Sequence, residues 1–191
     1  MKITFAHDCI ILDASCIISL YASGQMEGIL QSIQKSVAVA AFVFNREALW
    51  IYGGPDEDVK QTKEKIELQP FVDAGLLKVV TITSETEAQV YVNLSIEIDD
   101  GEAVTGAIAI HRNWAIGVDD KKARSLFQRE AAYLQLAYTL ELVKHWADIT
   151  EPSLETISRA LIRIQDRAAY EPGQNHPLYS WWMKYLPYTT R

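Results

Sequence analysis

Short apolar runs that alternate with helical patterns constrain the fold of this 191-residue chain most strongly. Each run has the length of a strand, and several are rich in β-branched residues. The runs lie at about residues 9–13, 37–41, 76–82, 114–118 and 134–137. Strands that alternate with helices favour a parallel sheet covered on both faces. We therefore expect an α/β fold, namely a three-layer α/β/α arrangement around a central parallel sheet of four to five strands.

The segments between the runs have helical character. The expected helices cover about residues 15–22, 25–34, 43–52, 56–69, 85–98, 102–111, 121–132, 139–146 and 153–169. Gly53 ends the third of these helices, because Gly54 and Pro55 follow it. Ser84 and Ser153 are candidate N-caps for two others. The helix at 102–111 is nearly apolar all round, so we expect it to be buried.

Carboxylates occupy the ends of these segments. Asp13 ends the first apolar run, Asp119 and Asp120 end the fourth, and Glu102 starts a buried helix. Glu47 lies on the helix after the second run. The carboxyl ends of parallel strands meet at one edge of the sheet, where functional crevices form. Acids gathered there would repel one another unless divalent metal ions neutralised them.

Composition and charge limit the classes of function. The net charge of −7 and the pI of about 5.1 count against a general nucleic-acid binder, although a metal site would itself contribute acids. Lys121, Lys122 and Arg124 either contact phosphate or form an exposed helical turn. No apolar run reaches 18 residues, and the N-terminal stretch lacks a signal-peptide pattern, so we expect a cytoplasmic protein without membrane association. Cys9 and Cys16 lack metal-ligand spacing and are expected to be reduced, buried thiols.

The order of the acidic motifs resembles that of a PIN domain, the metal-dependent ribonuclease fold of the toxins in many toxin–antitoxin pairs. The motifs are Asp13-Ala14-Ser15 after a strand, Glu47 in a helix, Gly101-Glu102-Ala103, and Gly117-Val118-Asp119-Asp120-Lys121-Lys122-Ala123-Arg124. The resemblance covers about residues 8–146. It implies a PIN-like catalytic domain at residues 1–146. Residues 147–191 would then form a helical and aromatic extension, packed on the same domain or at an interface.

The resemblance also implies roles for individual residues. Asp13 would be a direct metal ligand, supported by the hydroxyl of Ser15. Glu47 and Glu102 would match the next two acids of the family.

The acid after the fourth strand is ambiguous between two neighbours. The family usually has Thr/Ser-x-Asp there, and placing Val118 at the first position selects Asp120, although Val118 cannot supply a hydroxyl. Asp119 also stays a candidate metal ligand, and its alternative role is a cap of the helix that starts at Lys121.

The chemistry of phosphodiester hydrolysis fits this set of ligands. Mg²⁺ or Mn²⁺ can activate water and stabilise phosphoryl charge, and such hard cations prefer oxygen ligands. Zinc would favour His or Cys, and the four histidines share no ligand spacing. We expect Asp13 and Asp120 to anchor the metal, with Glu47 and Glu102 binding it directly or through water. Ordinary roles compete: Asp13 as a helix cap, Glu47 as a solvated residue, and Glu102 as an acid favoured by the helix dipole.

The sequence therefore predicts a metal-dependent ribonuclease that hydrolyses RNA, acting as a toxin with an antitoxin partner. The alternative is a catalytically inactive PIN-like binding or regulatory protein. An aspartate-nucleophile phosphatase is disfavoured, because Ser15 stands where that chemistry needs a second acid. The aromatic segment at 179–185 either packs on the domain or forms an interface, such as that of a homodimer.

Overall fold

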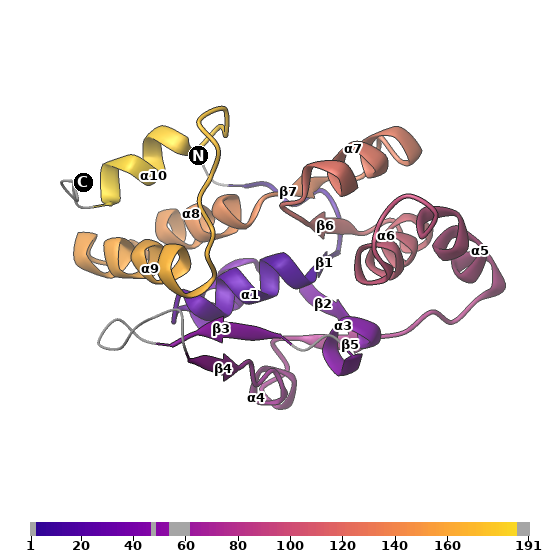
Figure 1. The fold of residues 1–191 in the computed structure, drawn as a ribbon, viewed down its shortest axis with the longest axis horizontal. Helices are drawn as coiled ribbons and strands as arrows, with labels where there is room; N and C mark the ends of the chain where they lie inside the picture. Colours follow the sequence, from indigo (N-terminus) through magenta and orange to yellow (C-terminus); the bar gives the residue numbers. More distant parts are fainter. Residues whose placement is uncertain (1–2, 47–48, 54–61, 187–191) are drawn as a thin grey trace.

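Five parallel strands form the central sheet of the computed structural model, which describes residues 3–46, 49–53 and 62–186. In spatial order they are β5 (Lys78–Val80), β2 (Ser36–Ala40), β1 (Cys9–Leu12), β6 (Ala115–Gly117) and β7 (Leu136–Ala137). The central strand β1 pairs with both β2 and β6, so that Leu12 lies beside Val39 and Gly117. The parallel sheet and its flanking helices confirm the predicted α/β/α fold (Figure 1).

Helices cover both faces of the sheet. They are α1 (Ala14–Ala22), α2 (Met26–Ser32), α3 (Ala41–Arg46), α4 (Gln69–Asp73), α5 (Glu85–Leu94), α6 (Asp100–Arg112), α7 (Lys121–Glu130), α8 (Thr139–Thr150), α9 (Leu154–Arg167) and α10 (Tyr179–Tyr185). The chain moves along the sheet one way from β1 to β2 and the other way from β5 to β6. Right-handed crossovers in opposite directions place their helices on opposite faces. Accordingly α6 packs on β1, β2 and β6 with α5 against it, whereas α1 packs with α8 and α9 (Figure 1).

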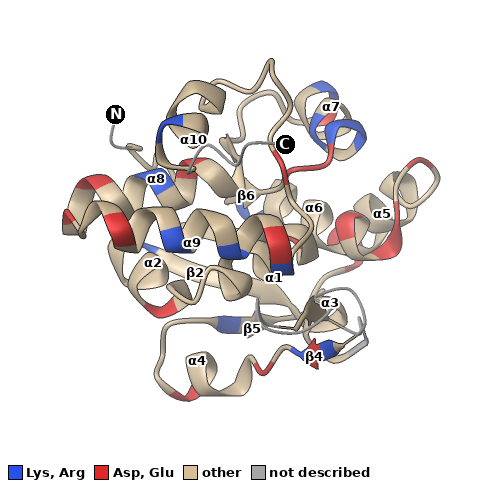
Figure 2. Cartoon of the chain, turned by 60° about the vertical axis from the view of Figure 1, so that its left-hand side comes forward, with Lys and Arg blue, Asp and Glu red and all other residues tan. Residues whose placement is uncertain are grey.

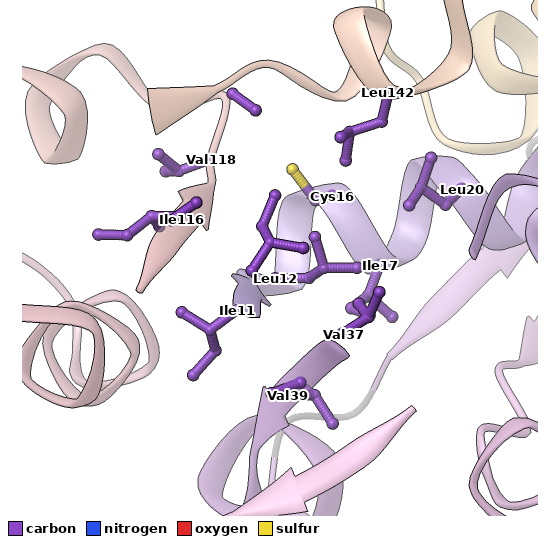
Figure 3. Packing of buried hydrophobic residues seen from close by; sticks show 14 of the residues in the cluster. Ile11, Leu12, Cys16, Ile17, Leu20, Val37, Val39, Ile116, Val118 and Leu142 are labelled. Carbon is purple, nitrogen blue, oxygen red and sulfur yellow. The ribbon is translucent and has the colours of Figure 1, made fainter. Parts of the chain in front are cut away.

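The core is centred on β1. Ile10, Ile11 and Leu12 are completely buried, because a parallel sheet with two covered faces leaves neither side of its central strand in water. Figure 3 shows Leu12 beside Cys16 and Ile17 of α1, with side chains of β2 and β6 on either side. This packing fixes the point at which β1 ends and the next residue, Asp13, begins.

The region between α3 and α4 differs from the prediction. Instead of a helix up to Gly53 and another at 56–69, the structure has β3 (Trp50–Tyr52) paired antiparallel with β4 (Lys63–Lys65). The helix predicted from residue 43 is confirmed up to Arg46, where α3 ends, and is wrong at residues 50–52. The helix predicted at 56–69 is wrong at β4, and residues 54–61 lie outside the described residues. Helical Lys–Glu pairs contribute only about 0.2–0.5 kcal/mol each. Strand pairing instead allows Ile51 and Ile66 to be buried.

The C-terminal helices pack on the rest of the molecule. Helix α9 contacts α1 and β3, and α10 contacts α9. Ser153 caps α9 as expected, since its hydroxyl accepts a hydrogen bond from the Thr156 amide at 3.1 Å. Trp182 of α10 is completely buried. Among the described residues, none of the helices is both long enough and apolar enough to cross a membrane.

Candidate active site

The carboxyl edge of the sheet brings together acids from distant parts of the sequence. Asp13 follows β1 directly, and its amide donates to the Gly117 carbonyl of β6 at 2.9 Å. Asp119 and Asp120 follow β6, two and three residues after its last residue, Gly117. The sheet register therefore places the first acid beside the pair, as the sequence predicted.

Asp13 is buried and is held by its own helix. Its side chain, 4% exposed, caps α1 and accepts hydrogen bonds from the Ser15 hydroxyl at 2.9 Å and the Ser15 amide at 3.3 Å. Burial raises the pKa of Asp13, the Ser15 hydrogen bonds lower it, and the charge of Asp120 raises it further. Asp13 is thus a helix cap and also a member of the acidic group. The predicted cap role is confirmed, and the predicted role as a metal ligand stays a prediction.

Glu102 reaches the same region from the first turn of α6. It is partly buried, and its pKa is raised to about 7 by burial and by the negative charges of Asp13 and Asp120. These effects arise only between carboxylates that lie near one another. Asp13, Glu102 and Asp120 therefore form an electrostatically coupled group, which we call the acidic triad.

Asp120, rather than Asp119, caps the helix after β6. Its Oδ1 accepts from the amides of Lys122 at 2.7 Å and Ala123 at 2.9 Å, so it is the N-cap of α7. The cap role considered for Asp119 is therefore wrong. The N-cap is the residue directly before a helix. Because α7 begins at Lys121, Asp119 lies one residue too early to be its N-cap.

Asp119 instead joins two elements of the fold. It is partly buried, its Oδ1 accepts from the Thr139 amide at 2.9 Å, and its Oδ2 accepts from the Thr139 hydroxyl at 2.5 Å. Burial raises the pKa of Asp119, and the bonds from Thr139 lower it. Asp119 therefore fixes the start of α8 to the end of β6. Sequence reasoning missed Thr139, whose only signal is a hydroxyl at the first position of a predicted helix.

The basic residues after the aspartates are not equivalent. Arg124 donates to the Val118 carbonyl at 2.8 Å, and its guanidinium lies over the Tyr138 ring, 3.4 Å from the centroid. Lys121 and Lys122 are exposed on the first turn of α7. Figure 2 shows the acidic loop leading into α7 beside the basic turns of that helix. Arg124 therefore stabilises the end of β6 next to the site, whereas the two exposed lysines can contact a solute.

The donor chemistry of the site fits Mg²⁺ or Mn²⁺, since carboxylate oxygens are the ligands that such hard cations prefer. Within residues 3–46, 49–53 and 62–186, however, no three His, Cys, Asp or Glu side chains already lie close enough to hold a metal ion. Glu47, the remaining predicted ligand, lies outside the described residues. Its place in the site stays a prediction.

Fold and site together define a class of protein: a parallel α/β sheet with carboxylates gathered at its carboxyl edge. A family model described as a PIN domain matches residues 9–167. The chain belongs to the PIN-domain family, whose members are generally nucleases and typically use divalent metals. The match includes α9 and stops before α10. A comparison with curated proteins gave no match.

Proposed function

We propose that this protein is a ribonuclease that hydrolyses RNA phosphodiester bonds with the help of Mg²⁺ or Mn²⁺. The observation that carries the proposal is the position of Asp13 and Asp120 after neighbouring strands, with Glu102 of α6 near enough for their charges to raise its pKa. Three carboxylates on separate elements create a strongly negative point that a divalent cation would neutralise.

The residues of this site would have separate roles in catalysis. The acidic triad, with Glu47 as a further candidate, would hold the metal, which supplies water activation and stabilisation of phosphoryl charge when bound. Ser15 keeps the Asp13 carboxylate in place through its two hydrogen bonds. Asp119, engaged by Thr139, would orient the strand end from which Asp120 projects. Lys121 and Lys122 would attract the phosphate backbone towards the site.

The substitution Asp13→Asn tests the proposal. It removes one metal-binding charge but keeps an oxygen that can accept the Ser15 hydrogen bonds. We expect at least about 100-fold slower cleavage of a labelled single-stranded RNA in Mn²⁺, at an unchanged or higher unfolding temperature. EDTA should stop cleavage by the unmodified protein. The matched control is Asp8→Asn, because Asp8 lies before β1 and pairs with Lys35 at the surface. Full activity of the Asp13→Asn protein would overturn the assignment.

The proposal extends to the role of the enzyme in the cell. We propose a cytoplasmic toxin that a protein antitoxin neutralises, supported by the PIN-domain membership of the chain. Induced expression of the unmodified protein should then arrest growth, whereas expression of Asp13→Asn should not. Growth arrest by both proteins would argue against a toxic nuclease activity.

A second candidate is a PIN-like protein that binds its partners without catalysis. The observation that favours it is the lack, among the described residues, of a group of three side chains already spaced for a metal ion. Titration calorimetry with Mn²⁺ separates the two candidates. Binding that disappears in Asp13→Asn supports the ribonuclease, and an absence of binding to the folded protein supports the second candidate.

A further inference from the structure

A pocket of about 470 Å³ is lined by Asp119 and Lys121, the residues on either side of Asp120. Residues of the segment 170–176, between α9 and α10, form another part of its wall. The first turns of α7 and the Tyr138 ring complete it. Binding sites for small molecules commonly have volumes of about 300–1,000 Å³, so the pocket can admit a ligand of that class.

The segment 170–176 is a fixed wall. The His176 Nδ1 accepts a hydrogen bond from the Leu178 amide at 3.0 Å. The His176 ring meets the Tyr138 ring edge to face, with centroids 4.5 Å apart. Pro172 is buried, and the Tyr170 ring packs against that of Trp182 at 5.9 Å. This wall lies beyond residues 9–167, which match the PIN-domain family model.

The lining of the pocket combines flat surfaces with polar groups. Tyr138 and Tyr170 supply aromatic rings, and Arg124 adds a planar cation that already lies over Tyr138. The Tyr170 hydroxyl makes no hydrogen bond to any residue that the structure describes, so it can bond to a ligand. Ser125 and Asn175 add polar side chains, and Lys121 stands at the α7 side.

These groups suit a flat, polar ring attached to a phosphate. Nucleic-acid bases stack on aromatic rings and on arginine guanidinium planes, and single-stranded RNA is recognised largely in this way. An acidic peptide would bring several carboxylates towards Asp119 and Glu171, whereas a nucleotide can place its one phosphate at Lys121 and its uncharged base near the two acids. A base within a duplex could not enter without first leaving its stack, at a cost of a few kcal/mol.

We propose that this pocket binds one unpaired nucleotide of the RNA, next to the phosphodiester bond that the acidic triad would cut. The base would lie against Tyr170 and the Arg124–Tyr138 pair, and its phosphate would face Lys121. The inference rests on the proposed ribonuclease function for the identity of the strand. It adds a requirement for an unpaired nucleotide beside the cleavage position.

Strand binding by the full-length protein tests the pocket. A fluorescein-labelled single-stranded hexaribonucleotide of mixed sequence is titrated in EDTA, so that no metal supports cleavage, and its anisotropy is measured. Tyr170→Ala should weaken binding roughly tenfold, because stacking contributes about 1–3 kcal/mol per base. Lys121→Gln should weaken it several-fold and reduce its salt dependence.

Matched variants separate the pocket from general effects on the protein. Tyr170→Phe keeps the ring and should stay within about threefold of the unmodified protein. Lys78→Gln removes an exposed lysine from the start of β5, at the opposite edge of the sheet, and should leave affinity unchanged. A labelled RNA duplex of about 20 base pairs, long enough to stay paired in the titration, should bind at least about tenfold more weakly. Equal affinity of Tyr170→Ala, or equal affinity for the duplex, would overturn the proposal.

A measurement on the unmodified protein tests the pocket without depending on whether a variant folds. Titration with AMP or UMP, followed by amide NMR, should shift signals in residues 121–125, 138 and 170–176. Shifts confined to other regions, or no shifts at all, would overturn the pocket. The two proposals fail separately. RNA cleavage without pocket-dependent binding would contradict only the proposed nucleotide pocket. Pocket-dependent binding without cleavage would contradict only the proposed ribonuclease function.

Discussion

Two acids in this protein show how the charge of a neighbouring side chain shifts the pKa of a carboxyl group. Glu87 is 1% exposed and meets the Arg112 guanidinium at 2.7 Å, which lowers its pKa to about 2. Glu102 is partly buried and faces Asp13 and Asp120, and its pKa is raised to about 7. Both acids belong to helices that pack together, α5 and α6. The first contributes to folding as an anion, and the second is suited to meet a cation.

The Glu87–Arg112 pair predicts a pH dependence of stability. The folded-state pKa of about 2 lies below the ordinary 4.5, so the stabilisation is fully present above about pH 4.5 and is lost as pH falls towards 2. The difference corresponds to about 3 kcal/mol. In urea unfolding at pH 7, 4.5 and 3, Glu87→Gln should be less stable at pH 7. Its stability should also change less between pH 4.5 and 3 than that of the unmodified protein. The exposed Glu85→Gln serves as control. Parallel pH curves for all three proteins would contradict the prediction.

The sequence predicted where most of the site's acids lie, but not which contacts they make. Asp13 and the Asp119–Asp120 pair follow buried strands, so their positions depend on the apolar runs alone. Which of the two aspartates caps α7 depends on the residue at which the helix begins, and a start at Lys121 makes Asp120 the N-cap. The contact of Asp119 with Thr139 depends on how α8 enters the fold, which local patterns do not specify.

At the level of elements, α6 packs closely against both α5 and α7 at Gly106. It carries Gly106 where a Cβ atom would overlap the Phe127 ring of α7 and lie 3.1 Å from Leu94 of α5. Three helices therefore meet at a residue without a side chain. Glycine is needed here for space, since its φ is not in the left-handed region.

The substitution Gly106→Ala should destabilise the protein. Overpacking lowers the free energy of unfolding by about 1–3 kcal/mol, and the higher helix propensity of alanine raises it by less than about 1 kcal/mol. Chemical denaturation should therefore give a lower free energy of unfolding. Gly173→Ala is the matched control, because no atom lies within 4 Å of the Cβ position there. Equal loss of stability in both variants would show that the close approach at Gly106 has no energetic effect.

The strand and helix predictions succeeded where one face or both faces of an element are buried. β1 and β6 are apolar throughout, β2 is apolar after Ser36, and Ser84 caps α5 as expected. The β3–β4 pair could not be foreseen, because β4 is fully exposed and its sequence, Lys-Glu-Lys, has no strand pattern. Its conformation depends on pairing with β3 and not on local preference.

At the level of the whole molecule, the C-terminal helices are part of one structure with the sheet. Trp182 is completely buried, and its Nε1 has no hydrogen-bond partner among the described residues. Its ring packs edge to face with that of Tyr170, a wall of the proposed nucleotide pocket. The docking of α10 is thereby connected to the shape of the pocket.

Removal of the Trp182 side chain should destabilise the whole protein. We expect Trp182→Ala to lower the free energy of unfolding by about 3–5 kcal/mol within a single thermal transition. Trp182→Phe should cost less, since it also removes a buried N–H group without a partner. Met183→Ala, at a position 42% exposed, should have little effect. A separate early transition in calorimetry would instead show that α10 unfolds independently.

The central position of β1 also determines when the acids can meet during synthesis. Its first neighbour, β2, follows soon in the sequence, whereas β6, its neighbour on the other side, comes after α6. Pairing between such distant segments forms late, and a chain emerging from the ribosome gains them in order. A nascent chain that ends before β6 carries Asp13 but not Asp120. If the acids act together, the chain is inactive until β6 and Asp120 have been synthesised and β6 has paired with β1.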